Sequence, residues 1–120
     1  MKLLRVGEHG KEIPAIIDNQ NNFRNLSNIL KDFTPENLNF ENLDKIKKLD
    51  LNSLPLIEST KRIGPCVIKP ANFIAIGLNY KAHAKETNSD APKEPIVFNK
   101  SPYCIVGPND NIVIPKNSKS

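Results

Sequence analysis

The residues best suited to chemistry in this chain are a histidine and a glutamate, His83 and Glu86, which lie three positions apart. They follow an uncharged run, residues 73–78, whose length and composition predict a buried strand. Residues 81–87 contain no Gly or Pro and predict a short helix, on which residues three apart share a face. Histidine titrates near neutral pH, and a neighbouring carboxylate orients the imidazole and supports its protonated form. The pair is therefore a candidate general base.

Other interpretations of these positions stay open from the pattern alone. His83 and Glu86 also fit an exposed helix that carries an incidental ion pair. Asn79 and Tyr80 precede the predicted helix, where they could bind substrate or shape the turn, and Asn79 favours the structural role. Lys100 follows an apolar strand, so it could neutralise a substrate carboxylate or an enolate, or be an ordinary solvated lysine.

Composition indicates an ordinary soluble protein of one small domain or slightly more. The chain has 120 residues, of which 38% are hydrophobic and 25% charged, with a net charge of +4. The basic residues are dispersed, and the densest cluster, Lys45, Lys47 and Lys48, lies between Asp44 and Asp50 as on a solvated helix face. We therefore expect no nucleic-acid partner. A positive field could instead attract small anions.

The sequence contains no candidate signal peptide and no segment long enough to span a membrane, so we expect a cytoplasmic protein without a membrane partner. The two cysteines, Cys66 and Cys104, match no metal-binding spacing. Neither has a histidine nearby in sequence, and we expect both to be small buried hydrophobic residues.

Two strands and two helices are predicted in the first half. Lys2–Val6 and residues 12–18 are strand-like and are joined by a turn with two glycines, which predicts a hairpin. Pro14 favours an edge position for the second strand. The spacing of Leu26, Ile29, Leu30 and Phe33 predicts an amphipathic helix. Thr34-Pro35-Glu36 predicts the start of another helix, which would end near Asp50.

The second half begins after a connector. Residues 53–70 are rich in proline and predict a domain boundary, with an N-terminal domain over residues 1–65 and a second domain over residues 66–120. Gly77 is expected to allow close backbone approach. Further strands are predicted at residues 96–98, 103–106 and 112–114. Because these short strands have no terminal element to cover them, we expect the chain to be the front portion of a longer protein.

Many of these features occur in the same order in one enzyme family. They are Met1-Lys2-Leu3-Leu4-Arg5-Val6-Gly7, Pro14-Ala15, Leu54-Pro55, Arg62-Ile63-Gly64-Pro65-Cys66, Ile76-Gly77-Leu78-Asn79-Tyr80, His83, Glu86, Pro95-Ile96-Val97-Phe98, Lys100 and Ile105-Val106-Gly107-Pro108. Through them the chain resembles the N-terminal portion of fumarylacetoacetate hydrolase family proteins. It is most similar to bacterial members named ureidoglycolate lyase, 2,4-diketo-3-deoxy-fuconate hydrolase or 2-hydroxyhepta-2,4-diene-1,7-dioate isomerase.

The resemblance implies an α+β fold. A small N-terminal domain of a β-hairpin and helices would precede the first strands of a mixed β-roll catalytic domain, which is incomplete here. The resemblance also implies a homodimer and a divalent metal, Mg²⁺ or Mn²⁺, held by a Glu-x-Glu pair and a later Asp. Asp110 is the only acid after Glu94, so we expect no metal ligand in this chain and place the ligands beyond residue 120.

The family's reactions cleave a carbon–carbon bond in small oxo acids, or isomerise or decarboxylate them through an enol. By resemblance, His83 and Glu86 form a His-Glu dyad that acts as general base. Lys100, Tyr80 and Asn79 are the residues predicted to bind substrate. We therefore predict part of a metal-dependent hydrolase or lyase for 1,3-dicarbonyl or dicarboxylate oxo acids, with these 120 residues inactive alone. The alternatives are an isomerase or decarboxylase of 2-hydroxy-diene dioates, and a non-catalytic anion-binding module or inactive fragment.

Overall fold

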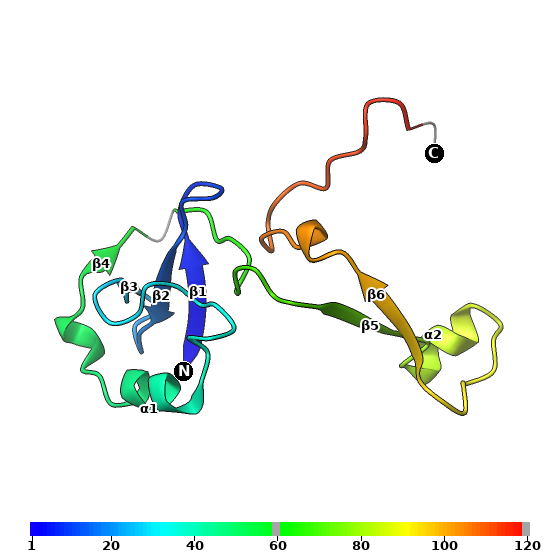
Figure 1. The fold of residues 1–120 in the computed structure, drawn as a ribbon, viewed down its shortest axis with the longest axis horizontal. Coiled ribbons are helices and arrows are strands. Elements are labelled where there is room, and N and C mark those ends of the chain that lie inside the picture. Colours follow the sequence, from blue (N-terminus) through cyan, green and yellow to red (C-terminus); the bar gives the residue numbers. More distant parts are fainter. Residues whose placement is uncertain (59–60, 119–120) are drawn as a thin grey trace. The chain divides into compact units, whose positions relative to one another are not determined.

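The computed structural model describes residues 1–58 and 61–118, and the chain divides into two compact units (Figure 1). Unit 1 contains residues 1–69 and 106–118, without the undescribed residues 59–60, and unit 2 contains residues 70–105. Both units combine short helices with antiparallel strands, which confirms the α+β class. Within the described part of the chain, none of the helices is long and apolar enough to cross a bilayer.

Unit 1 is built on a four-stranded antiparallel sheet in the order β1-β2-β3-β4. The strands are β1 (Lys2–Val6), β2 (Ile13–Ile17), β3 (Phe23–Asn25) and β4 (Leu56–Ile57). The predicted hairpin is confirmed, because β1 and β2 pair antiparallel. In the turn between them, Gly7 and Gly10 adopt positive φ angles of 135° and 78°. Such angles cost glycine little, and they let the chain reverse between two paired strands.

The predicted edge position of Pro14 is wrong. The strand that contains it, β2, lies between β1 and β3. Pro14 pairs with Arg5 in β1, and its carbonyl accepts the N–H of Leu26 at 2.9 Å. The pairing of β2 with β3 begins only at Ala15, opposite Asn25. A proline is tolerated here because its missing N–H would point past the end of the β3 ladder.

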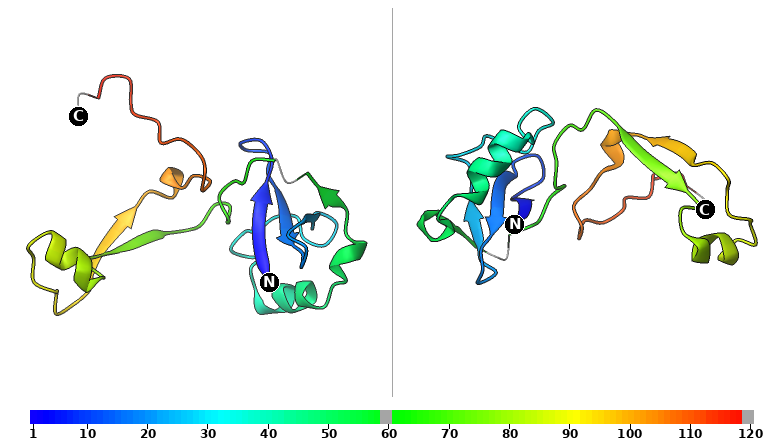
Figure 2. Two further views of the ribbon diagram at one scale, coloured as in Figure 1. Left: turned by 180° about the vertical axis from the view of Figure 1, so that it is seen from behind. Right: turned by 90° about the horizontal axis from the view of Figure 1, so that it is seen from below.

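Each face of this sheet carries a hydrophobic cluster. On one face lie Leu4, Val6, Ala15 and Phe23, with Ile13, Ile17, Ile57 and Ile63 packed against them. This confirms that Ile13, Ala15 and Ile17 share a face, as the alternation of strand side chains requires. On the opposite face Ile16 packs with Leu26, Leu30, Phe33 and Ile46. Ile46 comes from helix α1 (Phe40–Lys47), which lies against this second face (Figures 1 and 2).

Residues 26–33 do not form the predicted helix, although three of the four apolar residues are buried as expected. A single turn forms after β3, with the Ile29 and Leu30 N–H groups donating to the Leu26 carbonyl. The chain then leaves helical geometry because the Asp32 carboxylate accepts the N–H of Phe33 at 2.8 Å and binds the Arg5 guanidinium at 2.7 Å. Asp side chains that bond nearby backbone compete with helix formation in this way.

The predicted helix start at Thr34 is also wrong. Thr34 accepts the N–H groups of Asn37 and Leu38 in a turn, and α1 begins at Phe40. The cap of the helix is Asn39, whose side chain accepts the Asn42 N–H at 2.9 Å. Thr and Asn are both good caps, so local sequence alone did not separate the two starts.

The region predicted as a connector, residues 53–70, contributes to the sheet of unit 1; its residues 59–60 lie outside the described residues. Strand β4 pairs with β3, and Ile63 forms a bridge with Val6 on the far side of β1. The segment is thus extended, as its prolines suggest, but its backbone pairs with both sides of the sheet. The first of the two stretches that make up unit 1 ends at Lys69.

A buried ion pair between Asp18 and Arg24 closes the β2–β3 turn. Arg24 donates to the Asp18 carboxylate at 2.8 Å, and the backbone N–H groups of Gln20 and Asn22 also donate to it. Burial alone would raise the pKa of Asp18, but these donors, Arg24 first, outweigh it and lower the pKa to about 2. Asp18 therefore stays charged in the folded protein over most of the pH range.

We expect this pair to make the fold sensitive to acid. Since the folded pKa of Asp18 lies below the unfolded value, the charged form stabilises the fold above about pH 4, and this contribution is lost as the pH falls toward about 2. Asp18→Asn should weaken the dependence of the free energy of unfolding on pH in that window. Urea unfolding at several acidic pH values measures it, and an unaltered slope would contradict the role assigned to Asp18.

Unit 2 consists of a two-stranded antiparallel ribbon, β5 (Phe73–Gly77) and β6 (Ile96–Lys100), with helix α2 (Lys81–Glu86) between them in sequence. Strands at both positions and the helix were predicted and are confirmed. The prediction that residues 73–78 are buried is wrong: Ile74 is 58% exposed and Ile76 is 42% exposed. A ribbon of two strands has no second layer of its own to cover its faces.

Two further strand predictions are wrong. Instead of a strand at residues 103–106, the 3-10 helix η2 (Pro102–Cys104) forms, because Pro102 suits the first helical position and the Ser101 hydroxyl accepts the Tyr103 N–H. Residues 112–114 are exposed and belong to no strand, since they have no ladder partner among the described residues. Cys66 and Cys104 are free and exposed, so the expectation that they are buried is also wrong.

Candidate functional site

The candidate dyad lies on α2, directly after a tight turn that follows β5. Leu78, between the strand and the helix, has a φ of 48°, which is an unusual angle for a bulky residue. The Tyr80 carbonyl then accepts the Ala84 N–H at 3.1 Å and opens the helix. Ala84, 3% exposed, is the buried residue of α2.

The end of α2 is defined by hydrogen bonds that follow directly from its sequence. Asn88 adopts a left-handed angle of 51°, and its N–H donates to the Lys85 carbonyl. The Ser89 N–H donates to the Ala84 carbonyl at 2.9 Å, which completes a Schellman motif. The Thr87 hydroxyl donates to the carbonyls of His83 and Ala84. Although α2 has only six residues, both of its ends are held by hydrogen bonds.

The structure brings His83 and Glu86 together. The His83 Nδ1 atom lies 3.7 Å from the Glu86 Oε2 atom, and the two side chains are 56% and 75% exposed. This distance is longer than a hydrogen bond but short enough to count as an ion-pair contact when the imidazole is protonated. Water screens the interaction at this exposure, so it contributes little to stability. The arrangement leaves the imidazole accessible to a substrate, as a general base requires.

Gly77, at the end of β5, lies beneath an aromatic side chain of the neighbouring strand β6. A Cβ atom placed on it would lie 2.6 Å from the Cε2 atom of Phe98, whose ring covers this glycine from β6. The contact is with a side chain, so the expectation that Gly77 allows close backbone approach stays a prediction. Asn79 and Tyr80 follow in the turn with exposed side chains, and Tyr80 caps α2 through its backbone only. Their predicted contact with substrate stays a prediction.

Lys100 does not lie beside the dyad within unit 2. It pairs with Phe73, whereas Gly77, which leads into α2, pairs with Ile96 at the other end of the ribbon. Four residues of strand separate the two ends, which corresponds to about 13 Å. Lys100 instead places its ammonium group 5.5 Å from the centre of the Phe98 ring. A cation–π contact of this kind holds the lysine on the apolar face of β6.

The residues present do not form a metal centre. Among residues 1–58 and 61–118, no three His, Cys, Asp or Glu side chains are grouped as a metal ion would need. His83 and Glu86 supply two groups, and a hard cation such as Mg²⁺ prefers several oxygen ligands. We therefore derive no step of a reaction through a metal.

A cavity of about 750 Å³ lies in unit 1, whereas the candidate dyad belongs to unit 2. It is lined by the β2–β3 turn and by the end of α1 with the residues that follow, and it contains none of the predicted site residues. Asp18, the lining residue whose pKa is lowered to about 2, already accepts hydrogen bonds from Arg24 and from backbone N–H groups. The cavity thus offers no unpaired buried group for catalysis.

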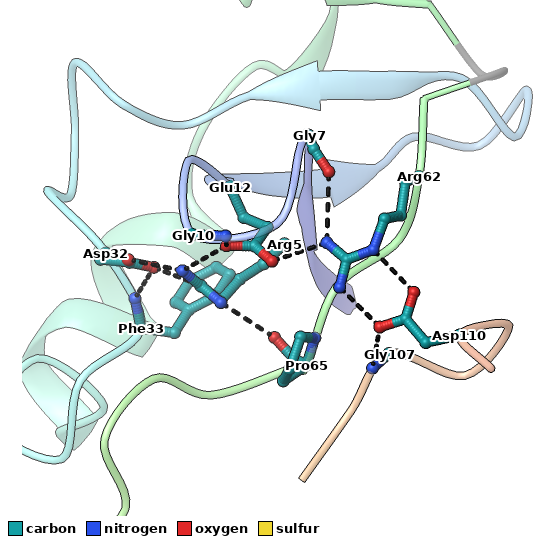
Figure 3. Close-up of polar contacts among 10 residues, drawn as sticks. All are labelled: Arg5, Gly7, Gly10, Glu12, Asp32, Phe33, Arg62, Pro65, Gly107 and Asp110. Carbon is teal, nitrogen blue, oxygen red and sulfur yellow. Dashed lines mark hydrogen bonds and ion pairs between the residues drawn. The ribbon is translucent and has the colours of Figure 1, made fainter. Parts of the chain in front are cut away.

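Sequence reasoning missed a network of ion pairs in unit 1. Arg62 binds both Glu12 and Asp110 (Figure 3). These residues are 50 and 48 positions from Arg62, and no helical or strand period relates residues so far apart. A local signal existed only for Asp110, which lies in a turn where Asp commonly binds its own backbone.

Comparison with known proteins finds a family model that matches the second half of the chain. Residues 72–120, which include β5, α2 and β6, match the family model described as fumarylacetoacetate (FAA) hydrolase C-terminal. Proteins named "Putative hydrolase" from Burkholderia ambifaria and Burkholderia multivorans are 45% and 46% identical over 118 residues. A relative of the same description from Burkholderia cenocepacia is 46% identical.

These alignments cover 98% of this chain but 42% of each relative, so the chain spans less than half the length of the curated proteins it matches. The resemblance found in the Gly-Leu-Asn-Tyr segment, His83 and Glu86 falls within the matched residues. The segment that carries His83 and Glu86, residues 72–120, is therefore similar to the C-terminal domain of the fumarylacetoacetate hydrolase family, whose model it matches.

Proposed function

We propose that this chain supplies the general base of a hydrolase that cleaves a carbon–carbon bond in small 1,3-dicarbonyl oxo acids. The observation that carries the proposal is the placement of His83 beside Glu86 at the end of β5, within the segment that matches the family model. The Burkholderia relatives named as hydrolases support the same class of reaction.

In the proposed reaction, the His83 imidazole removes a proton from a water molecule, and the resulting hydroxide adds to one carbonyl carbon of the substrate. The bond between that carbon and the central carbon then breaks, and its electron pair becomes the enolate of the departing ketone. The imidazolium returns its proton to the central carbon of this enolate, which yields a carboxylic acid and a ketone. The Glu86 carboxylate, 3.7 Å away, stabilises the imidazolium between these two transfers.

The family resemblance adds a divalent metal, Mg²⁺ or Mn²⁺, which would stabilise negative charge on the substrate oxygens as a Lewis acid. The described residues do not provide its ligand set, so dependence on a metal is an expectation for the protein and not a property of this segment. The same resemblance motivates a homodimer, with a small oxo acid as its partner. A cytoplasmic location stays a prediction from the sequence.

The rival function, a binding module that holds an anion between His83 and Lys100, is not favoured by the geometry. Within unit 2 these two residues lie toward opposite ends of the β5–β6 ribbon, so one small anion would not reach both. Lys100 as a ligand for a substrate carboxylate remains part of the proposal only for a longer, dicarboxylate substrate.

A product assay tests the proposal. The purified full-length protein, rather than residues 1–120 alone, is incubated with a panel of small 1,3-dicarbonyl acids, with Mg²⁺ or Mn²⁺, and the products are identified by NMR. We expect the paired acid and ketone of hydrolytic cleavage, and no reaction with a matched oxo acid that lacks the second carbonyl. Isomerised or decarboxylated products would transfer the dyad to the family's other reactions, and no turnover with either metal would overturn the proposal.

A further inference from the structure

Arg62 binds Asp110 through both arms of its guanidinium group. The Nε atom donates to Oδ1 at 2.6 Å and the Nη2 atom donates to Oδ2 at 2.5 Å (Figure 3). The two side chains are only 26% and 18% exposed. A planar fork matched to a carboxylate in this way gives a strong and geometrically specific contact.

The Asp110 side of this contact defines the path of residues 107–110. The Asp110 carboxylate accepts the Gly107 N–H at 2.7 Å, and the Asp110 N–H donates back to the Gly107 carbonyl at 3.1 Å. Gly107 is buried, and a Cβ atom on it would meet the Ile63 carbonyl and, at 3.1 Å, the Cα atom of Gly64. The segment therefore packs backbone against backbone on residues 63–64.

The Arg62 side of the contact is anchored in the sheet. Arg62 donates to Glu12 at 2.6 Å, and its carbonyl accepts the Gly7 N–H at 2.9 Å. Two positions later, the Gly64 N–H donates to the Arg5 carbonyl at 2.8 Å. Glu12 also lies 3.5 Å from the Arg5 guanidinium, which continues the network under β1. Residues 62–64 are thus fixed to the β1–β2 hairpin by backbone and side chains together.

The position of the pair in the chain gives it a role. Residues 70–105 form unit 2, so the chain leaves unit 1 after Lys69 and rejoins it at Val106. Arg62 lies on the leaving side and Asp110 on the returning side, 48 residues apart. We propose that Arg62 and Asp110 form a clasp: their ion pair holds the chain segments just before and just after unit 2 (residues 70–105) against the sheet of unit 1. The clasp does not depend on the proposed reaction.

The charges agree with a closed clasp at neutral pH. The Arg62 hydrogen bonds, then the Gly107 N–H, lower the pKa of Asp110 to about 2. Burial would raise the pKa of Glu12, but its hydrogen bond from Arg62 and its other contacts lower it. Both carboxylates therefore carry the negative charge that pairs with the Arg62 guanidinium. The contact closes the loop between residues 62 and 110, and closing a loop costs conformational entropy.

Amide hydrogen exchange in the whole protein tests the clasp. Asp110→Asn offers a single carbonyl oxygen and cannot serve both the guanidinium fork and the Gly107 N–H. We expect exchange in residues 106–111 to become about tenfold faster or more, as for loss of a charge-assisted bidentate contact. Amides of the β1–β2 ladder should keep their protection, because the sheet retains its own hydrogen bonds.

Two further variants complete the experiment. Arg62→Lys keeps a positive charge beside Glu12 but loses the fork, so it should loosen residues 106–111 selectively in the same manner, and it carries the test if Asp110→Asn does not fold. Asp44→Asn, which removes an exposed pair with Lys47, is the control and should leave these amides unchanged. Wild-type protection of residues 106–111 in both clasp variants, or an equal loss of protection across the sheet, would overturn the proposal.

Discussion

His83→Ala is expected to lower the turnover number of the protein by about two to four orders of magnitude, the range that general bases typically contribute. The imidazole is the group placed to accept a proton, and alanine cannot replace it. Because the His83 side chain is more than half exposed and its helix is held by its own caps, the fold should survive the change. Steady-state kinetics with the substrate found in the product assay measure the effect.

Neighbouring residues on α2 provide the controls. Glu86→Gln removes the charge beside Nδ1 while keeping the shape, so we expect a smaller loss of turnover than for His83→Ala. Lys85→Ala changes an exposed residue of the same helix and should leave turnover within about twofold of the wild type. If His83→Ala retained near-normal turnover, the dyad would return to being an ordinary surface ion pair.

Phe33→Ala is expected to lower the free energy of unfolding by about 3–5 kcal/mol, the cost of removing a fully buried aromatic side chain. Phe33 is 1% exposed and packs with Ile16 and Ile46 under α1. Its carbonyl also accepts the Ile68 N–H at 2.9 Å, which ties the end of the connector to this core. Urea-induced unfolding followed by circular dichroism measures the change.

The chain offers a matched control in a second phenylalanine. Phe40, at the start of α1, is 88% exposed. Phe40→Ala should therefore change the free energy of unfolding by no more than about 0.5 kcal/mol. Equal effects of the two substitutions would show that the core of unit 1 is not built around Phe33.

The elements that sequence predicted correctly are those whose signals are local. The two-glycine turn predicted the β1–β2 hairpin, and the apolar run at residues 73–78 predicted β5. The helix at Lys81–Glu86 was predicted from seven residues, and the residues that begin and end it, Tyr80 and residues 87–89, directly adjoin it in sequence. For the same reason the dyad was found before the structure was known, since three helical positions place His83 and Glu86 on one face.

The errors arise where a distant group decides the local conformation. The apolar spacing of residues 26–33 suits a helix, but Asp32 is bound by Arg5, 27 positions earlier, and the segment becomes a loop with the same residues buried. In this segment, burial was thus predicted better than secondary structure. The exposure of β5 was missed for a related reason. An apolar composition indicates that a strand can be buried, but it does not identify the segment that would cover it.

The sequence by itself determined the hairpin, the β5–α2 turn and the pairing of His83 with Glu86, because each depends on backbone preferences and hydrogen bonds within a few residues. Only the tertiary structure decided that Pro14 lies in a central strand, that Lys100 lies at the far end of its ribbon, and that Arg62 holds Asp110. These depend on strand order, register and contacts across 48 residues, which chain closure and packing select and no local period encodes.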